Sequence, residues 1–246
     1  MIHLISDLHL SADDPALLAR FKRFSARLSP GDSLYILGDL FEYWLGDDAV
    51  DFLGHRPVQA AISQITTRDI DVFFMAGNRD FLVGKDFADE CNMTLLPSEH
   101  FIDFGDEKIL LVYGDSLCTD DVAHQKFRAI VLNAAWQAGF LAKTIAERDG
   151  LARLARYRSD DGKAQKTSEI MDVTPLAVRQ LMDARSVRLL IHGHTHRPAI
   201  HRIGSVDARP RYRIVLGDWA SAESAISLDE NRLTLEFQGT KETLPF

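Results

Sequence analysis

The sequence of 246 residues has little cysteine and no long hydrophobic run. Its two cysteines, Cys91 and Cys118, are far apart and form no Cys-x-x-Cys motif, which argues against a disulfide framework. No apolar run approaches the roughly 20 residues that span a bilayer, and no signal peptide precedes the first predicted strand. We therefore expect a cytoplasmic protein in a reducing compartment, whose contact with any membrane is peripheral.

Basic residues are also in the minority, with 28 Lys and Arg against 36 Asp and Glu. A formal charge of -8 disfavours anionic partners unless bound cations reverse it locally, and neither nucleic acid nor a protein partner is predicted. The excess is uneven, because residues 126–166 carry nine Lys or Arg but four Asp or Glu. This segment either contacts phosphate or anionic lipid or is a solvated helical face, and charge alone favours the solvated face.

Short apolar runs end abruptly in polar clusters along most of the chain. The runs are Met1–Ser6 before Asp7, Leu34–Leu37 before Gly38 and Asp39, Val72–Ala76 before Gly77 and Asn78, Ile109–Tyr113 before Gly114 and Asp115, Val187–Ile191 before His192 and His194, and Tyr212–Leu216 before Gly217 and Asp218. Each run has the length and composition of a buried strand. Strands that lead into polar residues place ligands at strand ends, where open α/β sheets build their sites.

Other segments indicate helices and antiparallel strands around this framework. Apolar residues recur at helical spacing after Pro15, and 101–112 has the pattern of a hairpin that turns at Gly105. Residues 225–228 and 233–237 flank a second polar turn. With 46% hydrophobic and 26% charged residues, the chain fits one globular domain. We predict an α/β sandwich of mixed sheets covered by helices.

The pattern of short apolar runs that end in polar clusters is absent between residues 123 and 171. Apolar residues there are spaced for one or two amphipathic helices, with breaks predicted at Gly139 and at Asp149-Gly150. We interpret this segment as a helical insertion that covers the site as a lid. Its apolar face could equally belong to the core.

Polar motifs follow the predicted strands in a fixed order. They are Asp7-Leu8-His9, Gly38-Asp39, Gly77-Asn78-Arg79-Asp80, Gly114-Asp115 and Gly193-His194-Thr195-His196. Each is weak alone, because a capping Asp or a surface His pair explains it equally well. Imidazoles and carboxylates suit Mn, Fe, Co or Zn, and the planar donors of Arg79 suit phosphate. Five such motifs in one chain predict a metal-dependent phosphate chemistry.

This ordered set resembles the motifs of the calcineurin-like metallophosphoesterase superfamily. The resemblance implies a four-layer α/β/β/α sandwich of mixed sheets with a helical lid. It also implies two divalent metal ions, with Mn²⁺ as the expected species, and Asp39 bridging them. By the same resemblance, Asp7, His9 and His196 complete one metal site, while Asn78 and His194 belong to the other.

Longer blocks resemble the UDP-2,3-diacylglucosamine pyrophosphohydrolase family. The blocks are Gly38–Glu42, Gly77–Leu82, Gly114–Asp121, Ile170–Val173 and His192–Pro198. The specific parts are Cys118-Thr119-Asp120-Asp121 and Ile170-Met171-Asp172-Val173, because the metal motifs are shared by the whole superfamily. In the family, the residues that match Asn78, Arg79, Asp121, Ser159, Lys166 and His194 contact substrate, and Lys163 takes a position where Asn is expected.

The resemblance implies a reaction as well. A water activated by two metals attacks the uridylyl phosphorus of UDP-2,3-diacylglucosamine and releases UMP and 2,3-diacylglucosamine 1-phosphate in lipid A biosynthesis. Asn78, Arg79 and His194 would be the catalytic side chains. The nucleotide-lipid substrate would place the protein on the cytoplasmic face of the inner membrane, an anionic surface with which it associates peripherally.

One position departs from the family pattern. Tyr113 stands where the family has a His before the Gly-Asp of the fourth strand. A neutral phenol with a pKa near 10 is a poor ligand for Mn²⁺ and suits a harder ion better. Three alternatives therefore stay open besides the lipid hydrolase: a weakly bound second metal, a phosphodiesterase or phosphatase for a soluble substrate, and a binding scaffold that has lost catalysis.

Three further residues are weighed as lone candidates. His3 on the first strand is expected to be packed rather than a ligand. His124, beside Asp121, either assists substrate binding or caps a helix. Cys118 is expected to be a small buried residue and not a nucleophile, because no His is patterned to activate it.

Overall fold

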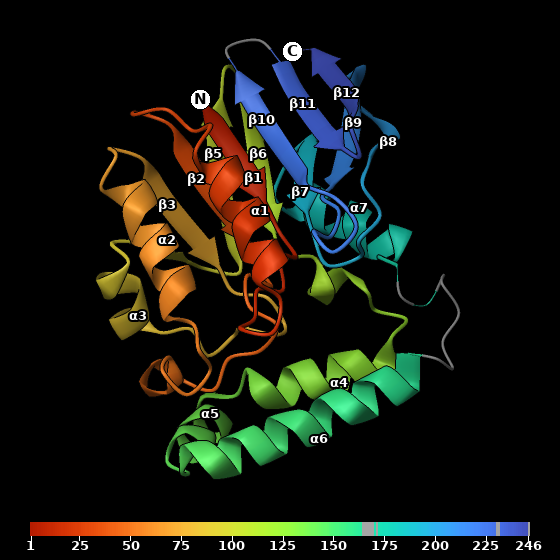
Figure 1. Cartoon of the computed structure of the whole chain (residues 1–246). Coiled ribbons are helices and arrows are strands. Elements are labelled where there is room, and N and C mark those ends of the chain that lie inside the picture. The colour runs from red at the N-terminus through yellow and green to blue at the C-terminus, as the bar shows by residue number, and fades with distance from the viewer. Residues whose placement is uncertain (164–169, 171, 230–231, 246) are drawn as a thin grey trace.

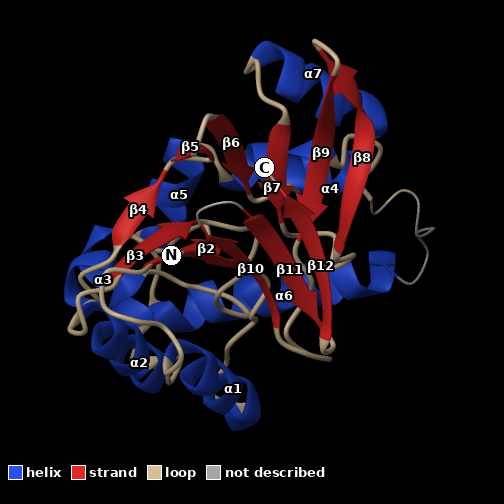
Figure 2. Ribbon diagram, turned by 90° about the horizontal axis from the view of Figure 1, so that it is seen from above, coloured by secondary structure: helices blue, strands red, loops and turns tan. Residues whose placement is uncertain are grey.

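The structure is a computed structural model of the chain, and it describes residues 1–163, 170, 172–229 and 232–245. Side chains are described for these residues except 157–163. Within this part of the chain the strands form two mixed sheets that face each other (Figure 1). Figure 2 views the same arrangement from above, with helices on the outer side of each sheet.

The larger sheet has seven strands among the described residues, in the order β12-β11-β10-β1-β2-β3-β4. Their bounds are β1 (Ile2–Ile5), β2 (Ser33–Leu37), β3 (Asp71–Met75), β4 (Thr94–Leu96), β10 (Ser224–Asp229), β11 (Arg232–Phe237) and β12 (Thr240–Pro245). Strands β1 to β4 are parallel to one another. Strand β10 pairs antiparallel with β1, and β11 and β12 continue the antiparallel part.

The smaller sheet has five described strands in the order β5-β6-β7-β9-β8. Their bounds are β5 (Glu99–Phe104), β6 (Glu107–Val112), β7 (Leu189–His192), β8 (Ala199–Val206) and β9 (Arg209–Val215). Strands β6, β7 and β9 are parallel, whereas β5 and β8 are antiparallel edge strands. The predicted hairpin around Gly105 is the β5–β6 pair, which confirms that prediction. The strands predicted on either side of the second turn, β10 and β11, pair antiparallel, while residues 230 and 231 lie outside the described residues.

Helices cover the outer face of each sheet, which completes four layers. The helices on the larger sheet are α1 (Pro15–Ser25), α2 (Arg56–Thr66) and α3 (Lys85–Glu90), and the smaller sheet carries α7 (Pro175–Ala184). Two short 3₁₀ turns, η1 (Asp47–Ala49) and η2 (Asp115–Leu117), lie in loops that follow β2 and β6. The predicted four-layer sandwich of mixed sheets is therefore confirmed.

Alternation along the strands accounts for the layers. In β2, Leu34 and Ile36 pack against the helices of the larger sheet, while Tyr35 and Leu37 face the other sheet. In β6, Ile109 and Leu111 face the space between the sheets, and their neighbours pack on α7. Because successive strand side chains point to opposite faces, strands buried on both sides are apolar throughout. Burial on both faces explains why the segments that were predicted to be strands are apolar along their whole length.

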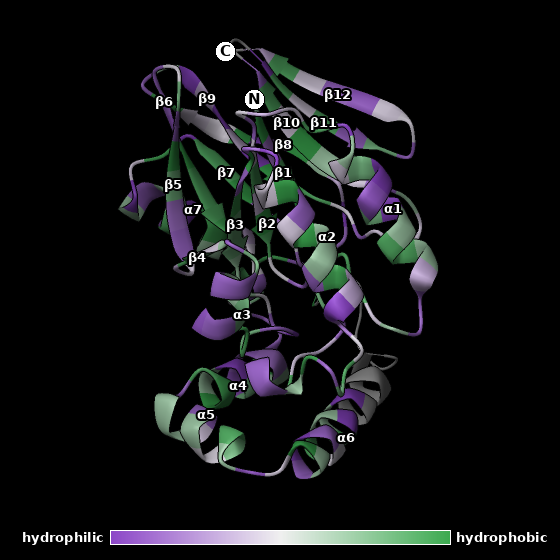
Figure 3. Cartoon of the chain, turned by 60° about the vertical axis from the view of Figure 1, so that its left-hand side comes forward, coloured by the Kyte–Doolittle hydropathy of each residue, from purple (hydrophilic) through white to green (hydrophobic). Residues whose placement is uncertain are grey.

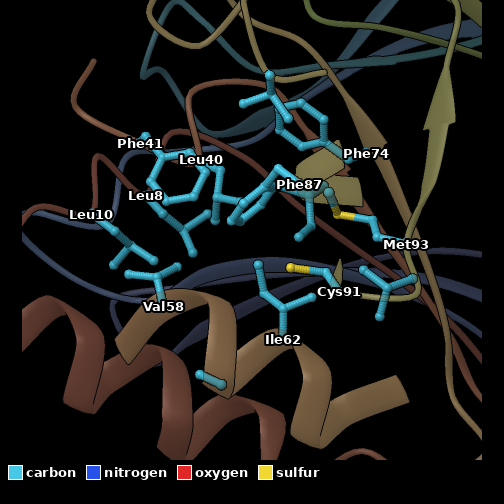
Figure 4. Close-up of a cluster of buried hydrophobic side chains, with 14 of the residues drawn as sticks. Leu8, Leu10, Leu40, Phe41, Val58, Ile62, Phe74, Phe87, Cys91 and Met93 are labelled. Carbon is cyan, nitrogen blue, oxygen red and sulfur yellow. The ribbon is translucent and has the colours of Figure 1, made fainter. Parts of the chain in front are cut away.

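The largest core lies between the larger sheet and helices α1 to α3. Figure 4 shows part of it, including residues from the loops that leave β1 and β2. Leu8, Leu10 and Leu40 are 0% exposed, and Phe41 stacks edge-on against Phe87 of α3 with ring centroids 5.5 Å apart. These buried residues alternate in sequence with the polar motifs. Packing of the apolar residues therefore fixes the loops that carry the polar ones.

Three helices occupy the described part of the 123–171 segment: α4 (Val122–Val131), α5 (Ala134–Leu141) and α6 (Ile145–Lys163). They lie together on one side of the sandwich, and their colouring mixes hydrophilic and hydrophobic residues (Figures 1 and 3). Trp136, Phe140 and Ile145 pack against the main core. Over the described residues, none of the helices is long and apolar enough to span a bilayer. The assignment of α4 to α6 as a lid stays a prediction.

The predicted helix breaks in this segment were wrong. Gly139 lies inside α5 and Gly150 lies inside α6. The helices are instead separated at capping residues: the Asn133 side chain accepts hydrogen bonds from the first turn of α5. Thr144 and Glu147 form a reciprocal capping box at the start of α6. A capped terminus outweighs a single glycine, which costs only about 1 kcal/mol in a helix interior.

Replacement of either glycine by alanine tests this helix assignment. An added Cβ meets nothing within 4 Å at Gly139 or Gly150. We expect Gly139→Ala and Gly150→Ala each to raise the free energy of unfolding by about 0.5–1 kcal/mol, because alanine loses less backbone entropy. Urea titration followed by circular dichroism would measure the change.

The matched control is Gly105→Ala, since Gly105 also has open space around it but has a φ of +59°. This variant should lower the free energy of unfolding by about 1–2 kcal/mol, the cost of a left-handed conformation for a residue with a Cβ. Destabilisation by Gly139→Ala or Gly150→Ala would contradict the continuous helices.

Candidate metal centre

The polar motifs meet at one edge of the sandwich. Asp7, Asp39 and Asn78 follow β1, β2 and β3 of the larger sheet, while Tyr113 and His194 follow β6 and β7 of the smaller sheet. Within the smaller sheet, Gly193 N donates to Tyr113 O (2.9 Å). The two sheets are connected by His194 N, which donates to Asp7 Oδ2 (2.9 Å), and by Trp219 N, which donates to Asp7 O (3.1 Å). The helices α4 to α6 lie on the side toward which β1 to β3 run (Figure 1).

Asp7, His9 and His196 form one cluster with the spacing of a metal site. One ligand atom from each lies within 4.8 Å of the others. His196 Nε2 is 3.2 Å from Asp7 Oδ1, and His9 Nε2 is 3.9 Å from Asp39 Oδ2. The Asp7 side chain is fully buried. A carboxylate and two imidazoles at these separations fit a borderline divalent ion.

A second cluster surrounds the hydroxyl of Tyr113. This oxygen is 3.0 Å from Asn78 Oδ1, 3.2 Å from His194 Nδ1 and 3.3 Å from Asp7 Oδ1. The phenol has a single proton, so it can donate to only one of these acceptors at a time. The structure thus places Asn78 and His194 together, with Tyr113 where a further ligand is expected from the family pattern.

Acidic residues fix the orientation of two of the histidines. Glu42 Oε2 lies 3.1 Å from His9 Nδ1, and Asp218 Oδ2 lies 3.9 Å from His196 Nδ1. In both rings this leaves Nε2 directed at the buried aspartates. Metal-bound histidines commonly donate their other ring N–H to a carboxylate. Glu42 is close enough to His9 for this role, whereas Asp218 is too far from His196 for a direct hydrogen bond.

The backbone of the centre is unusual. Five of the six predicted metal ligands have positive φ: Asp7, His9, Asp39, His194 and His196, at 55°, 50°, 50°, 64° and 57°. Residues with a Cβ adopt this conformation rarely, and each instance costs about 1–3 kcal/mol. Such strain concentrates at functional sites. It turns alternate side chains of a loop, such as Asp7 and His9 or His194 and His196, toward one point.

Two glycines let the loops approach each other closely. A Cβ at Gly77 would lie 2.2 Å from Asp39 Oδ1, and a Cβ at Gly193 would lie 2.5 Å from Asp7 Oδ2. No other residue type fits in either place without displacing a carboxylate. The Gly that precedes Asn78 and the Gly that precedes His194 are therefore part of the site's geometry.

The two buried aspartates differ in their electrostatics. Burial raises the pKa of Asp39 to about 6, against the lowering effect of the His9 charge. For Asp7, burial also acts to raise the pKa, but the hydrogen bonds and charges of His196 and His9 bring it below its ordinary value. Burial lowers the pKa of His194 to about 4, which leaves a neutral imidazole. Neutral imidazoles and ionised carboxylates are the forms that bind metals.

Asp80 holds the two central loops together. Its carboxylate accepts backbone N–H hydrogen bonds from Gly77 (2.8 Å), Leu40 (2.7 Å), Asp39 (3.3 Å) and Phe41 (3.3 Å), and it is fully buried. Burial and the Asp39 charge raise the pKa of Asp80, while the N–H donors lower it. Because these donors belong to the loops after β2 and β3, Asp80 sets the position of Asp39 relative to Asn78.

The residues predicted to contact substrate differ in how close they lie to the centre and in whether the structure describes them. Arg79 lies at the centre, because its backbone N–H donates to Asp39 Oδ1 at 2.9 Å. Asp121 caps α4 by accepting a hydrogen bond from His124 N at 3.0 Å. The side chains of Ser159 and Lys163 are not described, and Lys166 lies outside the described residues. Their predicted roles stay predictions.

The structure also shows the surroundings of the three lone candidates, His3, His124 and Cys118. His3 Nε2 pairs with Asp32 at 3.4 Å and packs edge-on against Phe24, which confirms a structural role. The ring of His124 lies 5.2 Å from that of His194, beside the second cluster. Burial raises the pKa of Cys118 to about 12, so its thiol is not a nucleophile, as expected.

Sequence reasoning gave no role to Glu42, Asp80 or Asp218, although all three contact the centre. A signal was present for the first two. Glu42 and Asp80 lie within the motif blocks that suggested the family, three residues after Asp39 and two after Asn78. Acidic residues so close to predicted ligands are candidates for orienting them.

Substitution of Asp80 tests whether it organises the loops. In Asp80→Asn one oxygen becomes an NH₂ group that faces backbone donors. We expect the free energy of unfolding to fall by about 1–3 kcal/mol, the cost of unsatisfied buried donors. The control is Asp89→Asn, whose exposed carboxylate pairs only with Lys85 one helical turn away. Urea titration of both variants measures the difference, and equal stabilities would show that Asp80 is dispensable.

Comparisons with known proteins agree with this geometry. The family model of the calcineurin-like phosphoesterases matches residues 1–198. A UDP-2,3-diacylglucosamine hydrolase of Escherichia coli O7:K1 is 44% identical over 232 residues, which cover 94% of this chain and 96% of the relative. A protein of the same name from Chromohalobacter salexigens is 46% identical over 88% of this chain and 87% of its own.

Among solved structures, the phosphoesterase Yfce from E. coli aligns over 99% of this chain and 98% of its own, with 14% identity and a TM-score of 0.46. The family model and the sequence relatives both cover the loops that carry the metal motifs. The chain therefore belongs to the calcineurin-like phosphoesterase family and, within it, groups with the UDP-2,3-diacylglucosamine hydrolases.

Proposed function

We propose that this protein hydrolyses the diphosphate of UDP-2,3-diacylglucosamine to UMP and 2,3-diacylglucosamine 1-phosphate, a step of lipid A biosynthesis. The observation that carries the proposal is the identity of 44% across nearly the whole length of a hydrolase named for that substrate. The convergence of Asp7, His9 and His196 supports it, because relatedness alone does not ensure that a metal site is intact.

The candidate centre would hold two divalent cations. Asp7, His9 and His196 would bind one, Asn78 and His194 the other, with Asp39 between them. When bound, such a pair of cations lowers the pKa of water and polarises phosphoryl oxygens. The mixture of imidazole, carboxylate and amide ligands suits Mn²⁺ among several borderline ions, and we propose Mn²⁺.

The side chains around this centre would orient and neutralise the phosphates. The backbone N–H of Arg79 donates to Asp39 Oδ1, and its guanidinium donates to Glu42 Oε1 at 3.2 Å, beside the centre, where it can face a phosphoryl group. Planar guanidinium donors bind phosphoryl oxygens bidentately. His194 is neutral near pH 7, because burial lowers its pKa to about 4. It and Asn78 would contact the phosphoryl oxygens without competing for protons.

Helices α4 to α6 would bind the lipid part of the substrate. Their exposed apolar side chains are Phe127, Ile130, Leu141, Leu151 and Leu154. A cavity of about 120 Å³ lies between α4 and the centre, lined by residues that include Asn78, Tyr113, Phe81, Phe127 and Val131. Apolar surface next to a phosphate site suits an acyl chain. Asp121, Ser159, Lys163 and Lys166 would contact the sugar and its phosphate.

A nucleotide-lipid substrate lies at a membrane surface. We therefore also propose that the protein works on the cytoplasmic face of the inner membrane as a peripheral protein. The basic excess of residues 126–166 supports attraction to anionic lipid, because each basic residue near such a surface contributes roughly 1 kcal/mol.

Product analysis in isotopically labelled water tests the reaction. With Mn²⁺ and UDP-2,3-diacylglucosamine, we expect UMP and the lipid phosphate, with ¹⁸O from water found in UMP. That position of the label follows from attack at the uridylyl phosphorus. Mass spectrometry of both products measures it. Label in the lipid phosphate would contradict the predicted point of attack.

Two variants accompany this assay. Asp39→Ala should abolish turnover, because it removes the carboxylate between the two cation positions. The matched control is Asp71→Ala, since Asp71 is exposed at the opposite end of the neighbouring strand, β3. Equal activity toward the deacylated sugar nucleotide would favour a hydrolase for soluble substrates instead.

Tyr113 sets the affinity of the second cation position. Burial and the charges of Asp39 and Asp7 raise the pKa of Tyr113 well above its ordinary value, so it offers a neutral phenol near pH 7. We expect Tyr113→His to strengthen binding of the second Mn²⁺ by roughly 10–100-fold, because an imidazole lone pair is a better ligand. Isothermal titration with Mn²⁺ measures both affinities.

The control for this substitution is Tyr113→Phe, which keeps the ring and removes the hydroxyl. It should leave the second affinity unchanged if the phenol is not a ligand. Weaker binding in both variants would show that the Tyr113 hydroxyl itself binds the cation. Absence of turnover in the parent protein together with turnover in Tyr113→His would identify the natural chain as a scaffold.

A further inference from the structure

We propose that Glu42 is a positioning residue that couples helix α6 to the metal centre, by sharing one carboxylate among His9, Arg79 and Arg156. The inference rests on the proposed metal-binding role of His9. It concerns a residue with no place among the predicted ligands or substrate contacts.

The contacts of Glu42 come from three parts of the chain. Its Oε2 lies 3.1 Å from Nδ1 of His9, and its Oε1 lies 3.2 Å from Nη1 of Arg79. The same Oε1 accepts a hydrogen bond from Arg156 of α6. The Glu42 side chain is 25% exposed, so these three groups replace much of its water. One carboxylate thereby connects the loop after β1, the loop after β3 and the helix α6.

Glu42 has a fixed backbone from which to act. Its N–H donates to Leu10 O at 3.1 Å, and Leu10 N donates to Leu40 O at 2.8 Å. Its neighbour Phe41 is fully buried in the core. The carboxylate therefore starts from a rigid position, and its own rotation decides whether all three contacts exist together.

The contact with His9 sets which nitrogen faces the centre. A neutral imidazole has one N–H and one lone pair. When Nδ1 donates to Glu42, the lone pair is on Nε2, the atom that lies 3.9 Å from Asp39 Oδ2. A cation bound at Nε2 requires the proton on Nδ1, and the Glu42 carboxylate, 3.1 Å away, is the anionic group that faces this N–H. Metal binding and the orientation of Glu42 therefore support each other.

The contact with Arg156 transmits this orientation to α6. The helix is attached near its start, where Arg148 donates to Leu45 O and pairs with Asp48. Arg156 is two turns further along and stacks on Tyr43, with its guanidinium carbon 5.0 Å from the ring centroid. Rotation of Glu42 away from Arg156 would release this second attachment. It would also remove an acceptor from His9 and from Arg79.

A neighbouring ion pair shows what an uncoupled contact looks like. Arg153 of α6 pairs with Asp149 of the same helix, one turn away, and its side chain is 70% exposed. Asp149 also accepts a hydrogen bond from the Tyr43 hydroxyl at 3.4 Å, but Arg153→Ala removes only the intrahelical ion pair and keeps both Asp149 and the Arg156–Glu42 contact. Arg153→Ala is therefore a matched control for Arg156→Ala.

Two measurements test the proposal on the whole chain. The first is isothermal titration of metal-free protein with Mn²⁺. Glu42→Gln keeps the shape of the side chain but can no longer accept from all three partners as an anion. We expect it to weaken Mn²⁺ binding at the tighter site by roughly 10–100-fold. Arg156→Ala and Arg153→Ala should bind Mn²⁺ within about threefold of the parent, which is below the roughly fivefold lower edge of typical coupling.

The second measurement is hydrogen exchange over residues 145–156 with and without Mn²⁺. In the parent chain and in Arg153→Ala, Mn²⁺ should slow exchange there by roughly fivefold, because linkage makes the coupling reciprocal. In Glu42→Gln and in Arg156→Ala this response to Mn²⁺ should be lost. A purely structural role of Glu42 would lower protection equally with and without the ion.

Each outcome decides between named alternatives. An unchanged Mn²⁺ affinity in Glu42→Gln, or an unchanged exchange response in Arg156→Ala, overturns the coupling while leaving the proposed hydrolase intact. Failure of the parent chain to bind Mn²⁺ overturns both. If Glu42→Gln fails to fold, Arg156→Ala alone decides, because it removes the helix contact and leaves Glu42 beside His9 and Arg79.

Discussion

Two buried aspartates set close together are the constraint on which this structure depends. Asp7 and Asp39 are 0% and 2% exposed, and the groups that face their carboxylates are histidines, the Tyr113 hydroxyl and backbone N–H donors. Burial of unpaired charge is expensive in a low-dielectric interior. The protein offsets it with histidines and with N–H donors, among them Arg79 N at Asp39 and His194 N at Asp7. These donors position the carboxylates but leave their remaining oxygen lone pairs turned toward one point, where a cation would complete the compensation.

The same constraint explains where backbone strain is located and what supports it. Asp7, His9 and Asp39 could face inward together only if their loops adopt positive φ at alternate positions. The residues between them, Leu8 and Leu40, are fully buried in the core under α1 to α3 (Figure 4). Packing of these leucines holds the loops in a conformation that the backbone alone disfavours. Core residues and site residues therefore alternate along the same loops. A loss of packing around the leucines would change the direction of the ligand side chains.

The sequence predicted the layers and the order of the ligands better than it predicted their connections. Alternation and abrupt polar endings located the strands, because both follow from burial on two faces, as in Leu34 to Leu37. The breaks at Gly139 and Gly150 were wrong, since caps at Asn133 and Thr144 decide where those helices end and begin. The positions of Glu42 and Asp80 beside predicted ligands made them candidates for orienting roles, but the partners of each come from loops distant in sequence, which a local pattern does not specify. The positive φ angles of His194 and His196 could not be predicted from the sequence either, because a histidine residue does not by itself require that conformation.

The surroundings of Tyr113 show that a tyrosine in place of a histidine ligand changes the structure only locally. Its ring packs where Gly38 has no Cβ, since a Cβ there would lie 2.2 Å from the ring. It is 4% exposed and belongs to the core between the sheets. The fold thus accommodates a phenol in the place of an imidazole without loss of packing, and its hydroxyl finds acceptors in Asn78 and His194. Its hydroxyl also lies 3.3 Å from Asp7 Oδ1 and interacts with the Asp39 carboxylate. In the proposed two-cation arrangement the chemical consequence falls on the position held by Asn78 and His194, because His9, Glu42 and His196 lie in the other cluster.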